Sequence, residues 1–232
     1  MTEHSTPPKP HPTRGLVPQR QVRGAGVEWW ERVARRIRVP LGFATAGFYL
    51  VECARQAPHP TAIAWSLALV VSGLALRAAA SGTVKKNREL TVTGPYAYTR
   101  NPLYVGSALI AAGFALALMS MLVALVVAVG FAAIYIPVIG SEERFLRAAF
   151  PGFDVYCRLV PRFIPRLTPA KLNNGKDIGA VSTHVTSDAP EGFSRMLYRK
   201  HREYNSALGA ALLYLSLLFL HPLLELLWHG NR

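Results

Sequence analysis

The chain has 232 residues, of which 51% are hydrophobic and only 17% are charged, and its formal net charge is +13. A soluble domain usually carries about a quarter of charged residues, so this composition favours a small polytopic membrane protein. Cys53 and Cys157 lie far apart without CxxC or Cys/His spacing, and the seven histidines are scattered. The sequence therefore predicts neither a disulfide framework nor a metal site.

The N-terminal region is expected to divide into two parts. Residues 1–27 are rich in Pro and Arg, lack the apolar stretch of a signal peptide, and are predicted to be a disordered basic tail. Residues 28–38 have helical periodicity, with Trp30, Val33 and Ile37 on one face. Such a helix would lie in the headgroup layer, either as a simple cationic anchor or as a grip on substrate headgroups.

Five apolar stretches are candidate transmembrane helices, because about 20 apolar residues cross the hydrocarbon core. Only Met119 and Ser120 separate the third stretch from the fourth, so these two are expected to form a tight antiparallel hairpin. The predicted fold class is all-α, an integral membrane bundle of about five transmembrane helices. Several stretches are short, so tilt or buried flanking turns would complete them. The stretches cover residues 39–54, 61–80, 103–118, 121–139 and 207–228.

Charge asymmetry predicts the orientation. The three segments 1–38, 77–100 and 140–205 hold 24 of the 26 Lys and Arg residues, and they alternate with segments that hold almost none. Loops with excess Lys and Arg face the cytoplasm. We therefore expect the N-terminus to be cytoplasmic, together with the two polar regions considered next.

The most informative feature is the loop Gly-Pro-Tyr-Ala-Tyr-Thr-Arg-Asn-Pro-Leu-Tyr-Val-Gly at residues 94–106. Its Gly-Pro and Asn-Pro pairs are turn signals, and Pro102 suits the first turn of the helix that follows. Free N–H groups at that helix N-terminus favour an anionic ligand group. Tyr96, Tyr98 and Tyr104 could stack on an aromatic base or form hydrogen bonds, although an interfacial aromatic belt is the alternative explanation.

A pair of carboxylates, Glu142 and Glu143, follows a stretch without any charged residue, residues 103–141. The pair is either a solvated helix end, which the nearby Arg144 and Arg147 would suit, or part of a binding site. Acidic residues contribute little to topology, so orientation does not explain them. Two adjacent carboxylates facing backbone donors could bind an ammonium, a sulfonium or ribose hydroxyls.

The chain after the acidic pair is predicted to stay at the membrane face. An amphipathic helix is expected to end at Pro151 and Gly152, and a cationic, aromatic segment then runs to residue 166. This segment is either a snorkelling interfacial segment or a lid that holds lipid phosphate or covers a cofactor. Tyr156 and Arg162 are its candidates for substrate contact.

The C-terminal third is expected to contain a linker at residues 167–192, rich in Asn, Gly, Ser, Thr and Asp. Residues 193–232 are expected to form a basic juxtamembrane helix followed by the last span. Residues 39–166 would then be the core of the protein.

The ordered motifs Gly-Pro-Tyr-x-Tyr-x-Arg-Asn-Pro-x-Tyr-x-Gly, an apolar hairpin, Glu-Glu-x-x-Leu, Phe-x-Gly … Tyr and Val-Pro-Arg cover residues 83–166. This order resembles the membrane methyltransferases of the isoprenylcysteine carboxyl methyltransferase and phospholipid N-methyltransferase superfamily. The resemblance implies a helical membrane enzyme that uses S-adenosylmethionine at the cytoplasmic face. Positioning and exclusion of water would then supply much of the rate.

The resemblance also implies a set of cofactor-binding residues, while the catalytic residues stay unassigned. The family's contacts map onto Leu90, Tyr96, Asn101, Pro102, Tyr104 and Glu142, with Glu143 added from the phospholipid branch and Arg100 added from the same loop.

Two departures from the family pattern bear on the chemistry. Asn101 stands where many members carry His, and an amide cannot carry a proton at neutral pH, so an acid–base role there is not expected. The prenylcysteine branch also carries a basic residue shortly before the acidic pair, where residues 134–141 are uncharged here. This argues against carboxyl methylation by direct analogy.

We therefore predict an S-adenosylmethionine-dependent membrane methyltransferase acting on a lipid-like or amphiphilic small molecule. The alternatives are a non-catalytic membrane adaptor and a nicotinamide-dependent membrane reductase of the sterol type. The expected partners are membrane lipids and the amphiphilic substrate, with no nucleic acid, and the oligomeric state stays open. High Ala and Arg usage suggests a bacterial inner membrane.

Overall fold

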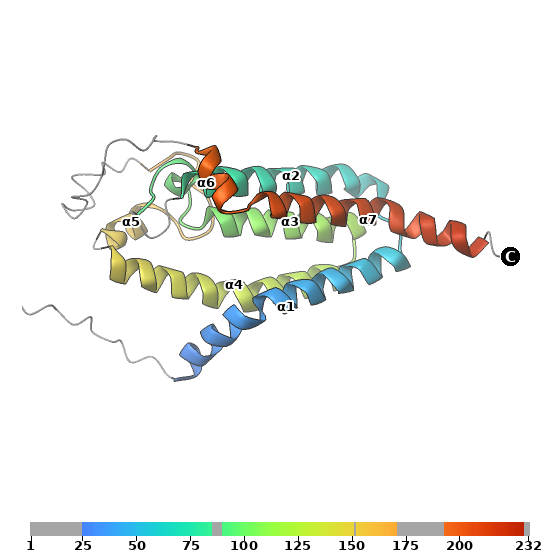
Figure 1. The fold of residues 1–232 in the computed structure, drawn as a ribbon, viewed down its shortest axis with the longest axis horizontal. Coiled ribbons are helices and arrows are strands. Elements are labelled where there is room, and N and C mark those ends of the chain that lie inside the picture. The colour runs from blue at the N-terminus through green and yellow to red at the C-terminus, as the bar shows by residue number, and fades with distance from the viewer. Residues whose placement is uncertain (1–24, 85–89, 151, 171–192, 230–232) are drawn as a thin grey trace, which may run out of the picture.

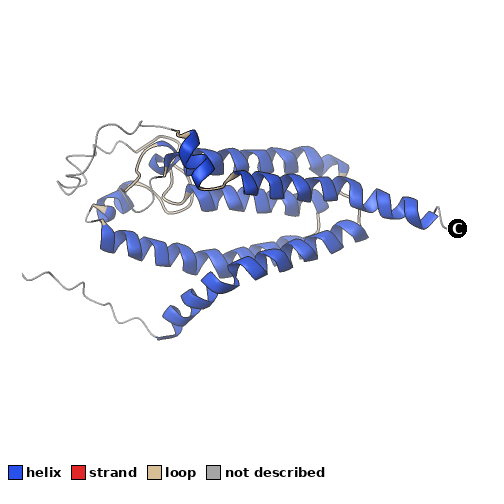
Figure 2. Ribbon diagram, viewed as in Figure 1, coloured by secondary structure: helices blue, strands red, loops and turns tan. Residues whose placement is uncertain are grey.

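The computed structural model describes residues 25–84, 90–150, 152–170 and 193–229. Most of the expected N-terminal tail and of the expected linker lies outside these residues, as does the side chain of Trp30. Within the described ranges the fold is helical and contains no strand (Figures 1 and 2). The elements are α1 (Ala25–Arg55), α2 (Pro60–Thr83), the 3₁₀-helix η1 (Gly94–Ala97), α3 (Pro102–Leu118), α4 (Met121–Ala149), α5 (Phe153–Leu159), α6 (Arg195–Lys200) and α7 (Tyr204–His229).

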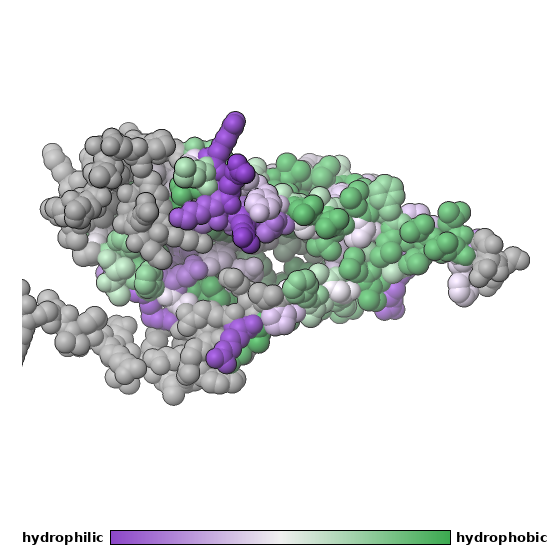
Figure 3. Space-filling model, in the orientation of Figure 1, coloured by the Kyte–Doolittle hydropathy of each residue, from purple (hydrophilic) through white to green (hydrophobic). Residues whose placement is uncertain are grey.

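Three helices of the described chain, α2, α4 and α7, are each long and apolar enough to cross a membrane, and α3 is a shorter apolar helix of 17 residues. The all-α membrane bundle predicted from sequence is confirmed, and the expected count of five spans is approximate. Large apolar side chains such as Trp65, Leu125 and Phe219 are exposed on these helices, as a surface in contact with lipid requires. A hydrophobic band covers the visible parts of α2 and α7, and polar residues gather over α6 (Figure 3).

Two helices continue where shorter segments were expected. The expected interfacial helix at residues 28–38 is the first part of α1, which runs without interruption past Pro40. Likewise α4 has 29 residues and passes through the acidic pair instead of ending near Ile139. At 1.5 Å per residue it is about 44 Å long, longer than the hydrocarbon core of about 30 Å. One end of α4 therefore extends into the polar layer.

The turn between α3 and α4 is the two-residue connection expected from sequence. Met119 ends α3 in the left-handed conformation with φ of 48°. Ser120 then caps α4, its side-chain oxygen accepting a hydrogen bond from the backbone N–H of Val123 at 3.4 Å. An N-cap serine satisfies one of the otherwise unpaired N–H groups of the helix. The two helices are therefore consecutive in the chain and run in opposite directions.

Beyond this turn the two helices pack on different partners. α3 lies along α2, whereas α4 lies mainly along α1 (Figure 1). α7 packs mainly on α1 and also contacts α2. At the turn end a shared core joins α1, α3, α4 and α7 through buried residues such as Tyr49, Phe114, Val123 and Leu217. The expected hairpin is thus correct in connection, but its helices diverge toward the other end.

Glycines allow α3 to pack closely against α2. A Cβ on Gly73 would lie 2.5 Å from the carbonyl oxygen of Gly106, and one on Gly106 would lie 2.7 Å from the carbonyl oxygen of Gly73. A Cβ on Gly113 would lie 2.8 Å from the carbonyl oxygen of Ser66. Small residues let transmembrane helices approach until their backbones touch. The α2–α3 contact is therefore the tightest helix pairing that the glycines define.

Gly73→Ala should destabilise the protein by about 1–3 kcal/mol, because backbone atoms of α3 must move, together with the side chain of Ile110, to admit the methyl group. The measurement is the unfolding midpoint in detergent. Gly130→Ala on α4 is the matched control, since a Cβ there meets nothing within 4 Å. Alanine is the better helix former, so the control should be neutral or slightly stabilising. Equal midpoints for the two variants would contradict the close α2–α3 contact.

Candidate cofactor and substrate site

The polar loop between α2 and α3 begins with a turn that only glycine adopts easily. Gly94 has a φ of +59°, and a Cβ there would lie 3.3 Å from the side chain of Thr83 at the end of α2. The 3₁₀-helix η1 follows at once and buries Tyr96 and Ala97. The loop is therefore folded back onto the end of α2.

The segment after α5 wraps around this loop and holds it by backbone hydrogen bonds. The side-chain hydroxyl of Thr99, which is buried, also donates to the carbonyl of Phe163 at 3.2 Å. The loop and the segment 160–170 thus form one unit, although the two are about 60 residues apart in the chain. The backbone bonds are Arg100 N–H to Pro161 O at 2.9 Å, Arg166 N–H to Tyr98 O at 3.0 Å and Ala170 N–H to Ala97 O at 2.9 Å.

Tyr156 on α5 fastens the same unit from inside. Its hydroxyl donates to the carbonyl of Tyr96 at 2.8 Å, and its ring is buried in a cluster with Val92 and Phe153. Leu90, one of the predicted cofactor contacts, packs against this cluster. Burial raises the pKa of Tyr156 well above the ordinary value of a phenol, so the hydroxyl keeps its proton and stays a donor.

Asn101 and Pro102 form the start of α3, as the turn signals predicted. Pro102 occupies the first turn of the helix and Asn101 the N-cap position, where its side chain makes no capping bond. The Asn101 amide instead donates to the carbonyl of Arg162 at 2.9 Å, and the residue is only 8% exposed. In this structure Asn101 therefore joins α3 to the wrapping segment.

Tyr104, one turn into α3, connects α3 to α4. Its hydroxyl donates to the Glu142 carboxylate at 2.8 Å, and this bond is exposed. Its ring meets Tyr135 of α4 edge-on, with 5.2 Å between centroids. The two helices that diverge after their turn are thus joined again at the other end through a phenol and a carboxylate.

Glu143 faces a different neighbour from Glu142. One of its carboxylate oxygens lies 3.4 Å from Nη1 of Arg100 and accepts a hydrogen bond from Nε of Arg162 at 3.1 Å. Glu143 and Arg100 are about 15% exposed, while Arg162 is half exposed. The same Arg100 nitrogen donates to the sulfur of Cys157 at 2.7 Å. Glu143 is therefore a structural bridge between α4, the loop and the wrapping segment.

Two guanidinium groups also meet beside Gly140. A Cβ at this glycine would lie 3.7 Å from Nη1 of Arg144 and 3.8 Å from Nη2 of Arg162. Residues 134–141 are uncharged, so the sequence indicated no cation at this point. The cations come instead from the next turn of α4 and from the wrapping segment.

The structure brings all ten predicted site residues to the same end of the bundle, in two environments. Leu90, Tyr96, Pro102 and Tyr156 lie in or against the apolar core of the loop unit. Asn101 is also buried but makes polar contacts, as do the more accessible members. The latter are Arg100, Tyr104, Glu142, Glu143 and Arg162.

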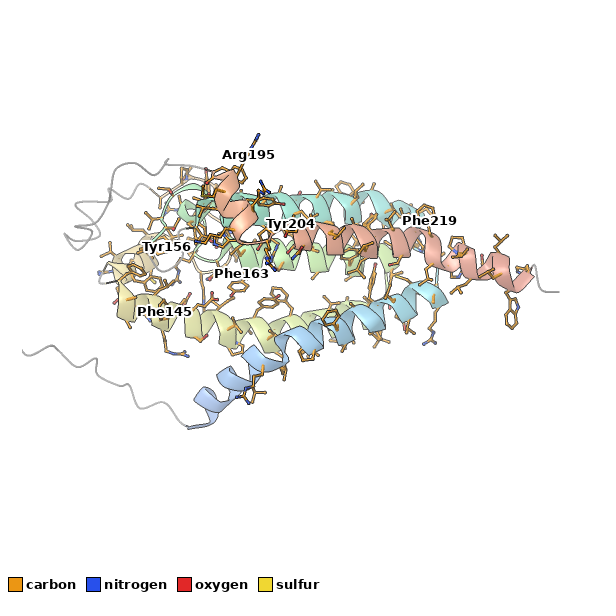
Figure 4. All side chains as sticks on the ribbon, in the orientation of Figure 1. Phe145, Tyr156, Phe163, Arg195, Tyr204 and Phe219 are labelled. Carbon is orange, nitrogen blue, oxygen red and sulfur yellow. The ribbon has the colours of Figure 1, made fainter. Side chains whose placement is uncertain are left out.

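An apolar groove of about 620 Å³ runs between α3 and α4. One wall is the stripe Ala108, Ala111, Ala112 and Ala115 of α3, and the facing wall is the stripe Ala124, Val127, Ala128 and Phe131 of α4. Both stripes have the i, i+3, i+4, i+7 spacing of one helix face, and small side chains leave the space between them. The groove begins at Met119–Met121 and reaches Phe163, which lies near Tyr156 at the polar end of the bundle (Figure 4).

Sequence reasoning missed a second polar cluster at this end. Arg77 on α2 pairs with Glu203 just before α7, with 2.8 Å between Nη2 and Oε2. The signal was available, because an Arg at the end of an apolar stretch is a candidate for a specific partner. Its partner is 126 residues away, and the chain pattern gives no means of pairing the two.

Comparison with known proteins finds a family match that covers most of the site but ends before Tyr156 and Arg162. Residues 62–152 match the family described as phospholipid methyltransferase, so the resemblance to the integral membrane methyltransferase superfamily is confirmed over this stretch, which is less than half of the chain. Together with the three apolar helices, the match suggests that this is an integral membrane methyltransferase.

Two curated relatives are named for metal resistance. The chain is 44% identical over 103 residues to the cobalt-zinc-cadmium resistance protein CzcN of Cupriavidus metallidurans, a match that covers 44% of this chain and 45% of that protein. It is 42% identical over 84 residues to the nickel-cobalt-cadmium resistance protein NccN of Alcaligenes xylosoxydans xylosoxydans, covering 36% and 39% respectively. The matches thus span less than half of each relative. No solved structure matches the chain.

Glu143→Gln should loosen the wrapping segment, because two guanidinium groups lose their shared carboxylate. Breaking a partly buried charge pair of this kind should cost about 1–3 kcal/mol, less than the 3–5 kcal/mol of a fully buried pair. Protease sensitivity and the unfolding midpoint in detergent measure the effect. Asp154→Asn is the control, since its partner Arg147 and Asp154 itself are both about half exposed and such pairs contribute little. A midpoint for Glu143→Gln no lower than that of the control would refute the bridge.

Proposed function

We propose that this protein is an S-adenosylmethionine-dependent methyltransferase that acts on a lipid-like amphiphile at the cytoplasmic face of a bacterial inner membrane. The observation that carries the proposal is the Tyr104–Glu142 hydrogen bond. It joins the polar loop to the acidic pair across two helices, and both ends of the bond lie inside the stretch that matches the phospholipid methyltransferase family.

The residues around this bond fit the polar parts of such a cofactor. The Glu142 carboxylate is exposed and can accept hydrogen bonds from an ammonium group or from ribose hydroxyls. The first turn of α3 begins with Pro102 without a side-chain cap, and a helix N-terminus favours a carboxylate. The buried phenol of Tyr96 and the side chain of Leu90 supply apolar surface nearby.

The cofactor would supply an activated methyl group, whose transfer to a nucleophilic acceptor needs no covalent intermediate on the protein. The protein would then contribute by positioning the two reactants and by excluding water from them. Glu142 and Tyr104 orient polar groups at the end of the groove, and the loop unit fastened by Tyr156 and Asn101 keeps that arrangement rigid. Fixing two reactants together and excluding water are established sources of rate.

The apolar groove supports an amphiphilic acceptor. Its walls are alanines and other apolar side chains, and it leads from the α3–α4 turn to Phe163, whose carbonyl is bonded to the loop through Thr99. An apolar chain in the groove would place its polar end beside the acidic pair. An anionic group on that polar end would also meet the guanidinium groups of Arg144 and Arg162 beside Gly140.

Glu142→Ala should abolish detectable cofactor binding and leave the protein folded, because the side chain is exposed. Tyr104→Phe should weaken binding less, since it removes the orienting bond and keeps the carboxylate. Calorimetric titration of the detergent-purified protein with S-adenosylmethionine and S-adenosylhomocysteine measures both. Glu225→Gln, a largely exposed glutamate on α7, is the control and should bind normally. Normal binding by a folded Glu142→Ala protein would refute the assignment of Glu142 to the cofactor site.

Ala112→Phe should fill the groove without touching the polar end. Transfer of a labelled methyl group into a membrane lipid extract should fall at least tenfold, while affinity for S-adenosylmethionine stays within about twofold. Ala211→Phe makes the same change at an exposed position of α7 outside the groove and should retain turnover. Unchanged turnover by Ala112→Phe would exclude the groove as the acceptor site, and no turnover by the wild type would favour a non-catalytic protein.

A further inference from the structure

We propose that the segment 193–206, which lies outside the family match, is an integral part of the site, and that Arg77 and Glu203 are positioning residues for the first two turns of α3. The cofactor-related part of this inference rests on the proposed function, because those turns carry Pro102 and Tyr104 and follow the N-cap residue Asn101. The geometry of the positioning itself stands independently of any ligand.

The Arg77–Glu203 pair has the geometry of a strong interaction. Nη2 of Arg77 donates to both carboxylate oxygens of Glu203, at 2.8 and 3.1 Å, and Nε donates to Oε2 at 3.2 Å. The side chains are only 20% and 12% exposed. Bidentate pairs fix direction as well as distance. Ser206 on α7 accepts a further bond from Nη2 at 3.1 Å, so the start of α7 is fixed on α2.

The remaining nitrogen of the same guanidinium, Nη1, is directed at α3. Nη1 of Arg77 donates to the hydroxyl of Ser107 and lies 3.5 Å from the carbonyl oxygen of Leu103. Its stem passes directly over Gly106, where a Cβ would lie 2.6 Å from Cγ of Arg77. One side chain therefore connects α2, α7 and the first two turns of α3. Glu203 neutralises that side chain and sets where it points.

Further contacts dock the segment before Glu203 on the end of α2. The backbone N–H of Ser194 donates to the carbonyl of Gly82 at 2.8 Å, and His201 Nδ1 lies 2.9 Å from the carbonyl oxygen of Ser81. The ring of Phe193 occupies the space that a side chain on Gly82 would fill. Arg195 points away from the bundle, whereas Tyr204 lies at the start of α7 (Figure 4). The segment is thus held from Phe193 to Ser206.

Glu203 also reaches the loop unit electrostatically. Burial raises the pKa of the Tyr96 phenol, and the carboxylates of Glu142 and Glu203 raise it further. The buried phenol of η1 therefore lies within the field of one carboxylate from the acidic pair and one from the C-terminal segment. This agrees with a site whose walls come from both parts of the chain.

Glu203→Gln tests the positioning role, because it removes the charge and keeps nearly the same shape. Arg77 would then remain in a poorly solvated place without its counter-charge and should shift away from Ser107 and Leu103. Hydrogen exchange of the backbone amides at residues 94–107, followed by mass spectrometry, should rise severalfold. Affinity for S-adenosylmethionine and for S-adenosylhomocysteine should fall together, by about tenfold, equivalent to 1.4 kcal/mol.

Two other variants make the test specific. Glu225→Gln makes the same chemical change within α7, beside His221 at 3.8 Å, and should leave exchange at residues 94–107 unchanged. Ser107→Ala keeps the ion pair and removes only one of its contacts with α3, so it should give a smaller rise in the same region. If Glu203→Gln does not fold, the exchange pattern of Ser107→Ala alone tests whether Arg77 positions α3.

The outcomes are distinguishable. Unchanged exchange at residues 94–107 in Glu203→Gln and Ser107→Ala would overturn the proposal, as would raised exchange confined to α6 and α7 with normal affinities. Loss of affinity for the charged S-adenosylmethionine but not for the neutral S-adenosylhomocysteine would make Glu203 a direct contact and also overturn the positioning role. If the wild type binds neither compound, the proposed function fails, while the exchange pattern still decides whether Arg77 and Glu203 position α3.

Discussion

The close approach of α2 and α3 is the constraint on which the remaining structure depends. Gly73 and Gly106 bring the two backbones together, and α3 is thereby committed to α2 along its length. α4 follows after only Met119 and Ser120, diverges from α3 and packs mainly on α1. The space that opens between them is apolar, since alanines line it. The close packing of α3 on α2 at glycines thus leaves the groove between α3 and α4, which is open toward its polar end unless other side chains close it.

The polar end is closed by contacts between side chains of α4, the loop and the wrapping segment. α4 is long enough to carry its carboxylates beyond the hydrocarbon core, and there Glu142 meets Tyr104 while Glu143 meets Arg100 and Arg162. Adjacent glutamates therefore have separate roles, one accessible and one enclosed. The proposed cofactor site requires this division, because a binding group must be reachable and its support must be rigid.

The sequence predicted the parts of this architecture that depend on local signals. The α3–α4 turn follows from two residues between apolar stretches, the start of α3 follows from Asn101 and Pro102, and the charge pattern correctly grouped the polar segments at one end. The continuous run of α4 through Glu142 was not predicted, because Pro137 and Gly140 lie just before the charged residues, and whether a helix tolerates an internal proline depends on its tertiary surroundings. The Arg77–Glu203 pair and the approach of Arg162 to Gly140 depend on tertiary contacts. One sequence cannot assign such a partner, even where it marks a residue such as Arg77 that needs one.

The groove between α3 and α4 has a consequence for how an amphiphile would be supplied. Its far end lies at Met119 and Met121, which are among the exposed apolar residues of the bundle. Under the proposed function, an amphiphile that enters the groove from the surrounding lipid would keep its tail in an apolar medium throughout. The quantity that governs occupancy is then the mole fraction of the amphiphile in the membrane, so dilution with inert lipid would act as dilution of substrate, whatever the volume of water around it.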